Sequence, residues 1–140
     1  MNRAILLFCL LFASNCFAAP LEEKDEEAIS STIGILFNSF QNGDTEVAYS
    51  LNTEDTRETF GSVGNYLATI KEHYQPIYQH DAAMVVDMSD VKDAVAVTVL
   101  IVDNYGAQWM AVFLMKQQEQ LWQIESCFLN PAAILDNNVI

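Results

Sequence analysis

The sequence predicts an α+β domain in which three N-terminal helices pack on one face of a curled antiparallel sheet of four to five strands. Two observations carry this prediction. Apolar residues recur at spacings of three and four through the first half of the chain, which is typical of helices with one buried face. In the second half, β-branched and aromatic residues recur at every other position, which is typical of strands. Helices that precede a run of antiparallel strands indicate the α+β class.

The start of the chain has the pattern of an export signal. Arg3 supplies a positive charge, residues 4–13 form an apolar stretch too short to span a bilayer, and Cys16 and Ala18 are small residues three and one positions before a cut after Ala18. A lipoprotein is the alternative, because residues 13–16 resemble a lipidation box.

Removal of residues 1–18 is expected to leave one domain over 19–131 and a short tail over 132–140. A protein so processed is periplasmic or secreted, with no membrane span after signal removal. The chain holds nineteen acidic residues against six lysines and arginines, a formal charge of −13. Because this charge repels nucleic acid and anionic lipid, neither is expected as a partner.

The first helix is expected over residues 21–40, and an acidic run at its start suits the positive end of the helix dipole. Gly34 lies inside this helix, where glycine costs up to ~1 kcal/mol relative to alanine, so it predicts a close approach by another element. The apolar residues that share one face are Ile29, Ile33, Leu36, Phe37 and Phe40.

Two further helices are expected before the strands. A short one over residues 44–51 follows an Asn-Gly pair, and the polar segment 52–59 is expected to be a turn or a ragged helix. The third is expected over residues 62–74, with Ser62 as its N-cap. A proline at position 76 disfavours helical geometry just before it, so the chain is expected to continue extended.

The strands are expected over residues 82–88, 94–102, 108–117 and 121–130. The last three are joined by tight turns, and tight connections imply antiparallel neighbours. Both alternating sets of side chains in 94–102 are apolar, whereas helices can cover only one face of the sheet. We therefore expect a homodimer in which a second copy covers the outer sheet face.

Four segments resemble, in order and at matching spacing, the landmarks of the exported bacterial domain of unknown function 4864 family. The resemblance covers roughly residues 28–131. The chain departs from the family pattern at Ser126, where a glycine is usual, and at Phe113, where a tyrosine is usual. The four segments are Phe60-Gly61, Tyr74-Gln75-Pro76-Ile77-Tyr78, Trp109-Met110-Ala111-Val112-Phe113 and Trp122-Gln123-Ile124-Glu125-Ser126-Cys127.

This resemblance implies a cone-shaped, nuclear transport factor two-like (cystatin-like) α+β fold. The family has no established activity, so no catalytic residue can be carried over. In such a fold the helices and the concave sheet face enclose an apolar cavity, which is the default place for a ligand. The residues expected to line it are Tyr66, Tyr74, Tyr78, Trp109, Phe113, Trp122, Ile124 and Phe128.

Strand alternation assigns the side chains of the last strand to faces. Trp122, Ile124, Ser126 and Phe128 are assigned to the inner face, so Glu125 and Cys127 are expected to point outward. Cys127 is alone once the signal is removed, which excludes an intramolecular disulfide. It is expected to be buried and inert, or else to pair between chains or to react.

We therefore expect a non-enzymatic exported binding or interaction module that holds a small apolar ligand and needs no cofactor. One alternative is a small lyase or isomerase that uses a cavity Asp or His supported by Tyr, with His73, His80, Asp87 and Asp103 as candidates. Another is an interaction protein that acts through its outer sheet face. No metal site is expected, because the histidines lack the spacing of a helical ligand pair.

Overall fold

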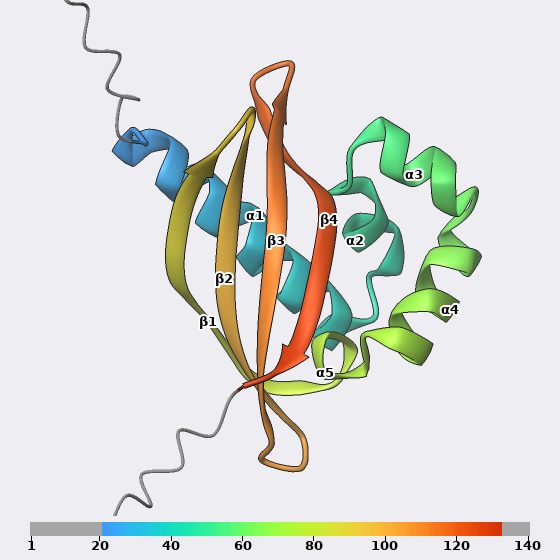
Figure 1. Cartoon of the computed structure of the whole chain (residues 1–140). Helices are drawn as coiled ribbons and strands as arrows, with labels where there is room; N and C mark the ends of the chain where they lie inside the picture. Colours follow the sequence, from blue (N-terminus) through green and yellow to red (C-terminus); the bar gives the residue numbers. More distant parts are fainter. Residues whose placement is uncertain (1–20, 133–140) are drawn as a thin grey trace, which may run out of the picture.

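An antiparallel sheet forms one layer of the molecule and helices form the other (Figure 1). The structure, a computed structural model, describes residues 21–132. The predicted signal segment and nearly all of the predicted tail lie outside these residues. The described helices are α1 Glu23–Asn42, α2 Thr45–Ser50, α3 Glu54–Phe60, α4 Val63–His73 and α5 Gln75–Tyr78. The described strands are β1 His80–Val91, β2 Ala94–Asp103, β3 Gln108–Gln118 and β4 Leu121–Pro131.

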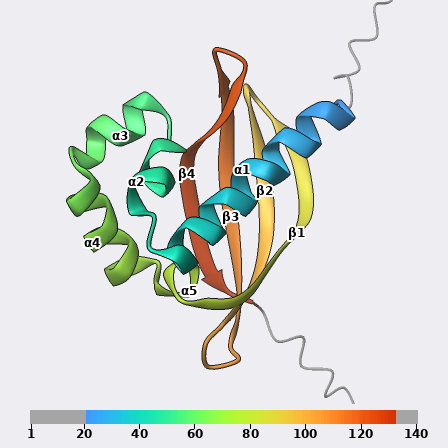
Figure 2. The ribbon, with the colours of Figure 1, turned by 180° about the vertical axis from the view of Figure 1, so that it is seen from behind.

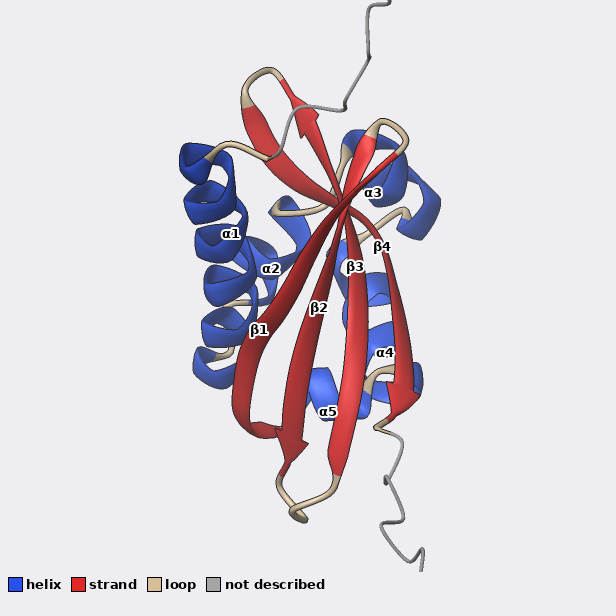
Figure 3. Ribbon diagram, turned by 60° about the vertical axis from the view of Figure 1, so that its left-hand side comes forward, coloured by secondary structure: helices blue, strands red, loops and turns tan. Residues whose placement is uncertain are grey.

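The four described strands follow one another in the order β1-β2-β3-β4, each antiparallel to its neighbour. Seen from behind, α1 crosses the strands diagonally, while α2, α3 and α4 form an arm beside β4 (Figure 2). The strands twist strongly across one another in front of the helices (Figure 3). These observations confirm the predicted α+β class and the predicted placement of the helices on one face of a curled sheet.

The core lies between α1 and the inner face of the sheet. On β2 the inward residues Val95, Val97, Val99 and Ile101 are at most 2% exposed. They face the apolar side of α1, whose buried residues are Ile29, Ile33, Leu36, Phe37, Ser39 and Phe40. α1 ends at Gly43, which adopts a left-handed φ of 76° and donates its N–H to the Ser39 carbonyl.

The structure adds two short helices to the three that were predicted. α3 covers most of the segment expected to be a turn or a ragged helix, because the Thr53 hydroxyl accepts a hydrogen bond from the Thr56 N–H and caps it. α5 replaces the expected extended segment. Pro76 lies in its first turn, where proline's fixed φ suits a helix and no N–H is needed.

A β-bulge in β4 overturns the predicted assignment of faces. Leu114 pairs with Ser126 and Met115 pairs with Ile124, so Glu125 is an extra residue without a partner on β3. Beyond it the alternation reverses. Cys127 lies opposite the buried Phe113, on the inner face, and Phe128 turns outward with 56% of its surface exposed. The prediction that Cys127 points outward and that Ser126 and Phe128 point inward was wrong, because period-two counting assumes an unbroken strand.

No helix among the described residues is both long enough and apolar enough to cross a membrane.

Candidate functional site

A cavity of about 420 Å³ lies between β4 and the arm formed by α3 and α4. Its volume falls in the lower part of the roughly 300–1,000 Å³ range of small-molecule sites. The wall is mostly apolar, with a polar end where α3 meets β4. The lining residues are Leu36, Phe40, Asn52, Thr56, Thr59, Phe60, Tyr66, Ile70, Tyr74, Ile77, Phe113, Ile124, Glu125, Ser126, Cys127 and Phe128.

Tyr66 of α4 is the centre of the aromatic wall. Its ring stacks on Phe40 at 6.3 Å between centroids and meets the edge of Phe60 at 5.1 Å. Such pairs add stability beyond the area that they bury, and they fix the ring orientation. Burial raises the pKa of Tyr66 to about 12, an effect that a polar contact with the Asn52 side chain partly offsets. The Tyr66 phenol is therefore a neutral hydrogen-bonding group at neutral pH.

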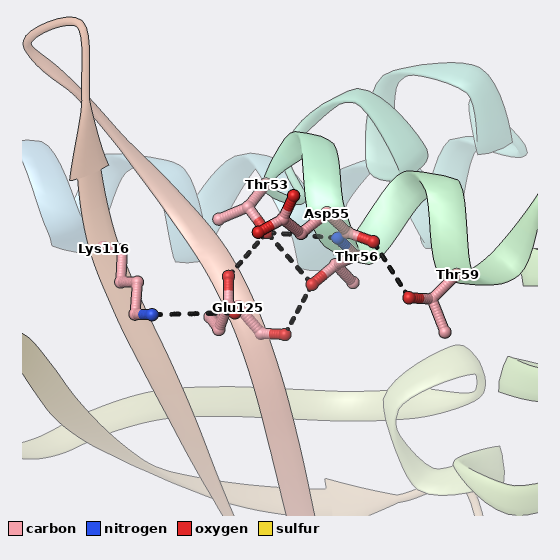
Figure 4. A network of polar contacts seen from close by, with 6 residues as sticks. All are labelled: Thr53, Asp55, Thr56, Thr59, Lys116 and Glu125. Atoms are coloured by element: carbon pink, nitrogen blue, oxygen red, sulfur yellow. Dashed lines mark hydrogen bonds and ion pairs between the residues drawn. The ribbon is translucent and has the colours of Figure 1, made fainter.

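Glu125 supplies the polar end of the cavity, since the bulge turns its side chain towards α3 (Figure 4). The Thr53 hydroxyl donates to Glu125 Oε2 at 2.6 Å, and the Thr56 hydroxyl donates to the Glu125 backbone carbonyl at 2.7 Å. Lys116 Nζ lies 3.7 Å from Oε1, and 27% of the Glu125 side chain remains exposed. The carboxylate is thus held in place by a short charge-assisted hydrogen bond and an ion pair.

Backbone pairing makes this polar end rigid. Asn52 forms an isolated parallel bridge with Ile124, next to the bulge. The Ile124 N–H donates to the Leu51 carbonyl and the Thr53 N–H donates to the Ile124 carbonyl, both at 2.9 Å. The connection between α2 and α3 is therefore joined to β4 at the position where Glu125 enters the wall.

Cys127 lies in the cavity wall but is a poor nucleophile. Burial raises the pKa of its thiol to about 12, so the thiol stays protonated at neutral pH. The Tyr74 hydroxyl donates to the Cys127 backbone carbonyl at 3.3 Å. Burial, and then the proximity of Cys127, raises the pKa of Tyr74 as well. This side of the cavity is consequently uncharged.

The structure places five of the eight predicted lining residues in this wall: Tyr66, Tyr74, Phe113, Ile124 and Phe128, the last from a largely exposed position. The other three were wrongly assigned to it. Tyr78 makes an edge-to-face contact with Phe40 at 5.9 Å between centroids, and Lys71 Nζ lies 5.2 Å from the centre of the Tyr78 ring.

The two tryptophans do not line this cavity, because the indole N–H of each donates a hydrogen bond to a carboxylate outside it. Trp109 Nε1 donates to Asp103 Oδ2 at 2.9 Å, beside the β2–β3 turn. Trp122 Nε1 donates to Asp25 Oδ1 of α1 at 3.1 Å. Both residues therefore connect elements of the fold instead of facing the cavity.

The predicted acid–base candidates lie outside this cavity. His73 and Asp87 are exposed, on α4 and β1 respectively. Asp103 organises the β2–β3 turn by accepting hydrogen bonds from the N–H groups of Tyr105 and Ala107, each at 2.9 Å. The indole N–H of Trp109, with the two backbone N–H groups, holds the Asp103 pKa below its usual range. His80 borders a different cavity, described below.

The sequence reasoning missed Glu125, Thr56 and Asn52 as wall residues. A carboxylate as the single charged residue of the strand 121–130 was a visible signal for Glu125. The other two depend on contacts between distant segments. No group of three or more His, Cys, Asp or Glu side chains suited to a metal ion occurs within residues 21–132.

Comparison with known proteins gives a family and a fold. Residues 22–135 match the model of a family described as Domain of unknown function (DUF4864). The structure is similar to the crystal structure of an NTF2-like protein of unknown function from Shewanella baltica OS155. The TM-score is 0.54 at 13% sequence identity, over 80% of this chain and 98% of that chain. At this identity the likeness shows the fold alone. No curated protein sequence matches the chain significantly.

Proposed function

We propose that this chain, which belongs to the DUF4864 family as its sequence landmarks predicted, is a binding module without enzymatic activity. Its proposed location is the periplasm or the extracellular medium. Its ligand is one small, largely apolar molecule held between β4 and the α3–α4 arm. The export pattern in residues 1–18 supports the compartment.

The observation that carries the proposal is the composition of the 420 Å³ cavity. Aromatic and aliphatic side chains form most of its wall, and its few polar groups converge at one end around Glu125. Removing apolar surface of a ligand from water is favourable by about 25 cal/mol per Å². The arrangement suits a ligand with an apolar body and one hydrogen-bonding group near Glu125 and Thr56.

Binding accounts for these side chains better than catalysis does. The Cys127 thiol is protonated at neutral pH, and the Glu125 carboxylate is already engaged by Thr53 and Lys116. A general base must reach the proton that it removes, whereas His73, Asp87 and Asp103 lie outside the wall. The residues that face a ligand here are mainly packing groups and neutral hydrogen-bonding groups.

The test uses N-phenyl-1-naphthylamine, a neutral apolar fluorophore, and two variants of α3. Thr59 lines the cavity from an exposed position, so Thr59→Phe fills space without removing core packing. Glu58→Phe adds the same side chain at an exposed position outside the wall. We expect saturable binding by the wild-type protein and by Glu58→Phe, and affinity at least about tenfold weaker in Thr59→Phe. Absence of binding to the wild-type protein, or equal affinity in both variants, would overturn the proposal.

Native mass spectrometry of the protein purified from the periplasm complements this test. A co-purified small molecule that is released on denaturation would identify the natural occupant, and its loss in Thr59→Phe would assign it to this cavity.

We also propose that the protein is a homodimer through its outer sheet face. The centre of this face is apolar and includes Leu100, Met110 and Val112, and at its edges Met84 and Phe128 are 60% and 56% exposed. A second copy presents the same uncharged centre, so the contact is self-complementary, and Asp87 lies at the β1 edge of this face in the same row as Thr98 and Val112.

Sedimentation equilibrium tests the dimer. We expect a dimer mass for the wild-type protein and a monomer mass for Val112→Lys, which places a charge at the centre of the face. A monomer mass for the wild-type protein at every concentration would refute the proposal.

A further inference from the structure

A second cavity, of about 330 Å³, lies between α1 and the beginning of β1. β1 and β4 are the two opposite edge strands of the sheet (Figure 2). Within the described part of the chain, the residues that line it are all different from those that line the first cavity. Its wall combines an apolar floor with polar groups at the rim. The lining residues are Ser30, Ile33, Gly34, Phe37, Asn38, Gln41, His80, Asp81, Ala82, Ala83, Val85 and Val99.

His80 borders this cavity with one ring nitrogen unused. Only 7% of the residue is exposed. Nδ1 lies 2.9 Å from the Ile77 carbonyl oxygen, so in the neutral ring Nδ1 carries the proton and donates it, and Nε2 is an acceptor. The edge-to-face contact with Phe37, at 4.8 Å between centroids, fixes the ring. Across residues 21–132, no hydrogen bond to Nε2 is formed. Nε2 is not among the buried polar atoms that lack a partner, so it is open to the cavity, where an N–H donor of a ligand can reach it.

Gly34 keeps the same cavity open. It lies in the interior of α1, where glycine is less favourable than alanine by about 1 kcal/mol. The prediction that Gly34 marks a close approach by another element was wrong, because, apart from its chain neighbours and the adjacent backbone of α1, no described atom lies within 4 Å of the position that a Cβ would occupy. That position belongs to the cavity wall, so any larger side chain there would project towards the open space.

The charges around the cavity define the class of ligand. Asp81 is the charged residue among those that line it, and no lysine or arginine is part of the described wall. The whole chain has a formal charge of −13, so an anion would be repelled. One histidine and one carboxylate are fewer than the three protein ligands of a typical catalytic metal site. A cation that carries N–H donors fits both the His80 acceptor and the Asp81 charge.

We propose that this cavity is a binding site for a small organic ammonium ion. One N–H of the ligand donates to His80 Nε2, the Asp81 carboxylate balances the charge, and the apolar part of the ligand lies against Ile33, Phe37 and Val85. The site is independent of the cavity beside β4 and does not rest on the function proposed for it.

The test compares two probes of similar size and opposite charge, benzylammonium and benzoate, by NMR titration of the full-length mature protein. We expect saturable binding of benzylammonium with a dissociation constant of about 1 mM or tighter, and no saturable binding of benzoate. The shift of the His80 Hε1 resonance reports the site. Equal affinity for both probes, or no saturable binding of benzylammonium, would refute the assignment.

Three variants locate the binding. Gly34→Leu fills the cavity and replaces glycine by a better helix former, so it should fold and bind at least about tenfold more weakly. Ser31→Leu is the matched control, since it adds the same side chain to an exposed position of α1 outside the wall. His80→Asn keeps a donor for the Ile77 carbonyl but lacks the Nε2 acceptor, and the same loss is expected. Binding retained in Gly34→Leu would overturn the proposal even where His80→Asn fails to fold.

Discussion

Replacing Thr53 by valine should separate the energetic contribution of the Glu125 network from that of packing. Thr53 is fully buried, and its hydroxyl donates to Glu125 Oε2 at 2.6 Å and accepts from the Thr56 N–H at 3.3 Å. Its oxygen also lies 3.0 Å from the Thr56 hydroxyl oxygen. Valine has nearly the same shape, so Thr53→Val removes both hydrogen bonds without opening a cavity.

The expected loss follows from these two contacts. A hydrogen bond to a charged group contributes about 1.5–3 kcal/mol, and the lower end applies because the Glu125 side chain is 27% exposed and can be hydrated instead. Loss of an N-cap costs about 1 kcal/mol. Together they predict a loss of about 2.5 kcal/mol in the free energy of unfolding, or about 10 °C in the melting temperature of a domain of this size.

Urea unfolding followed by circular dichroism measures this change. The matched control is Thr59→Val on the same helix: the exposed Thr59 hydroxyl donates only to the Asp55 carbonyl of its own helix, so the loss should stay within about 0.5 kcal/mol. In a Glu125→Ala background, Thr53→Val should cost only about 1 kcal/mol, because the N-cap alone remains to be lost. Equal losses for the two threonine variants, or an unchanged loss in the Glu125→Ala background, would refute the reasoning.

Two further predictions concern titrating groups. Burial raises the pKa of the Cys127 thiol to about 12, so iodoacetamide at pH 8 should alkylate the native protein at least about tenfold more slowly than the urea-unfolded protein. Mass spectrometry measures both alkylation rates, and equal rates would contradict the burial of the thiol. The Asp103 pKa lies below the ordinary value of 3.8, so this carboxylate stabilises the folded state above that pH and the contribution is lost as the pH falls through the folded pKa. Asp103→Asn should therefore weaken the decline of stability in acid, and urea unfolding at several pH values below 5 that shows an unchanged decline would contradict this role.

The candidate site was predictable where it depends on local spacing. Tyr66 lies on the apolar face of α4, Tyr74 is the C-cap of the same helix, and Phe113 and Ile124 lie on the inner faces of strands, so the periodicity placed them in the wall. Trp109 and Trp122 have the same pattern but were wrongly assigned to the wall, because each indole N–H is drawn to a carboxylate of another segment. Residue type and spacing in the sequence do not show which distant carboxylate an indole N–H will bond to.

The amino-acid sequence by itself determined the α+β class, the order of the main elements and the family. These depend on periods of 3.6 and 2 and on capping residues, which act between near neighbours in the chain. Only the tertiary structure decided how the strands face the helices. The bulge at Glu125 is stabilised by Thr53, 72 residues away, and it reverses the orientation of Cys127 and Phe128. Both cavities are likewise bounded by segments far apart in the chain, since the free energy of contacts between such segments sets the register and the bulges of a sheet.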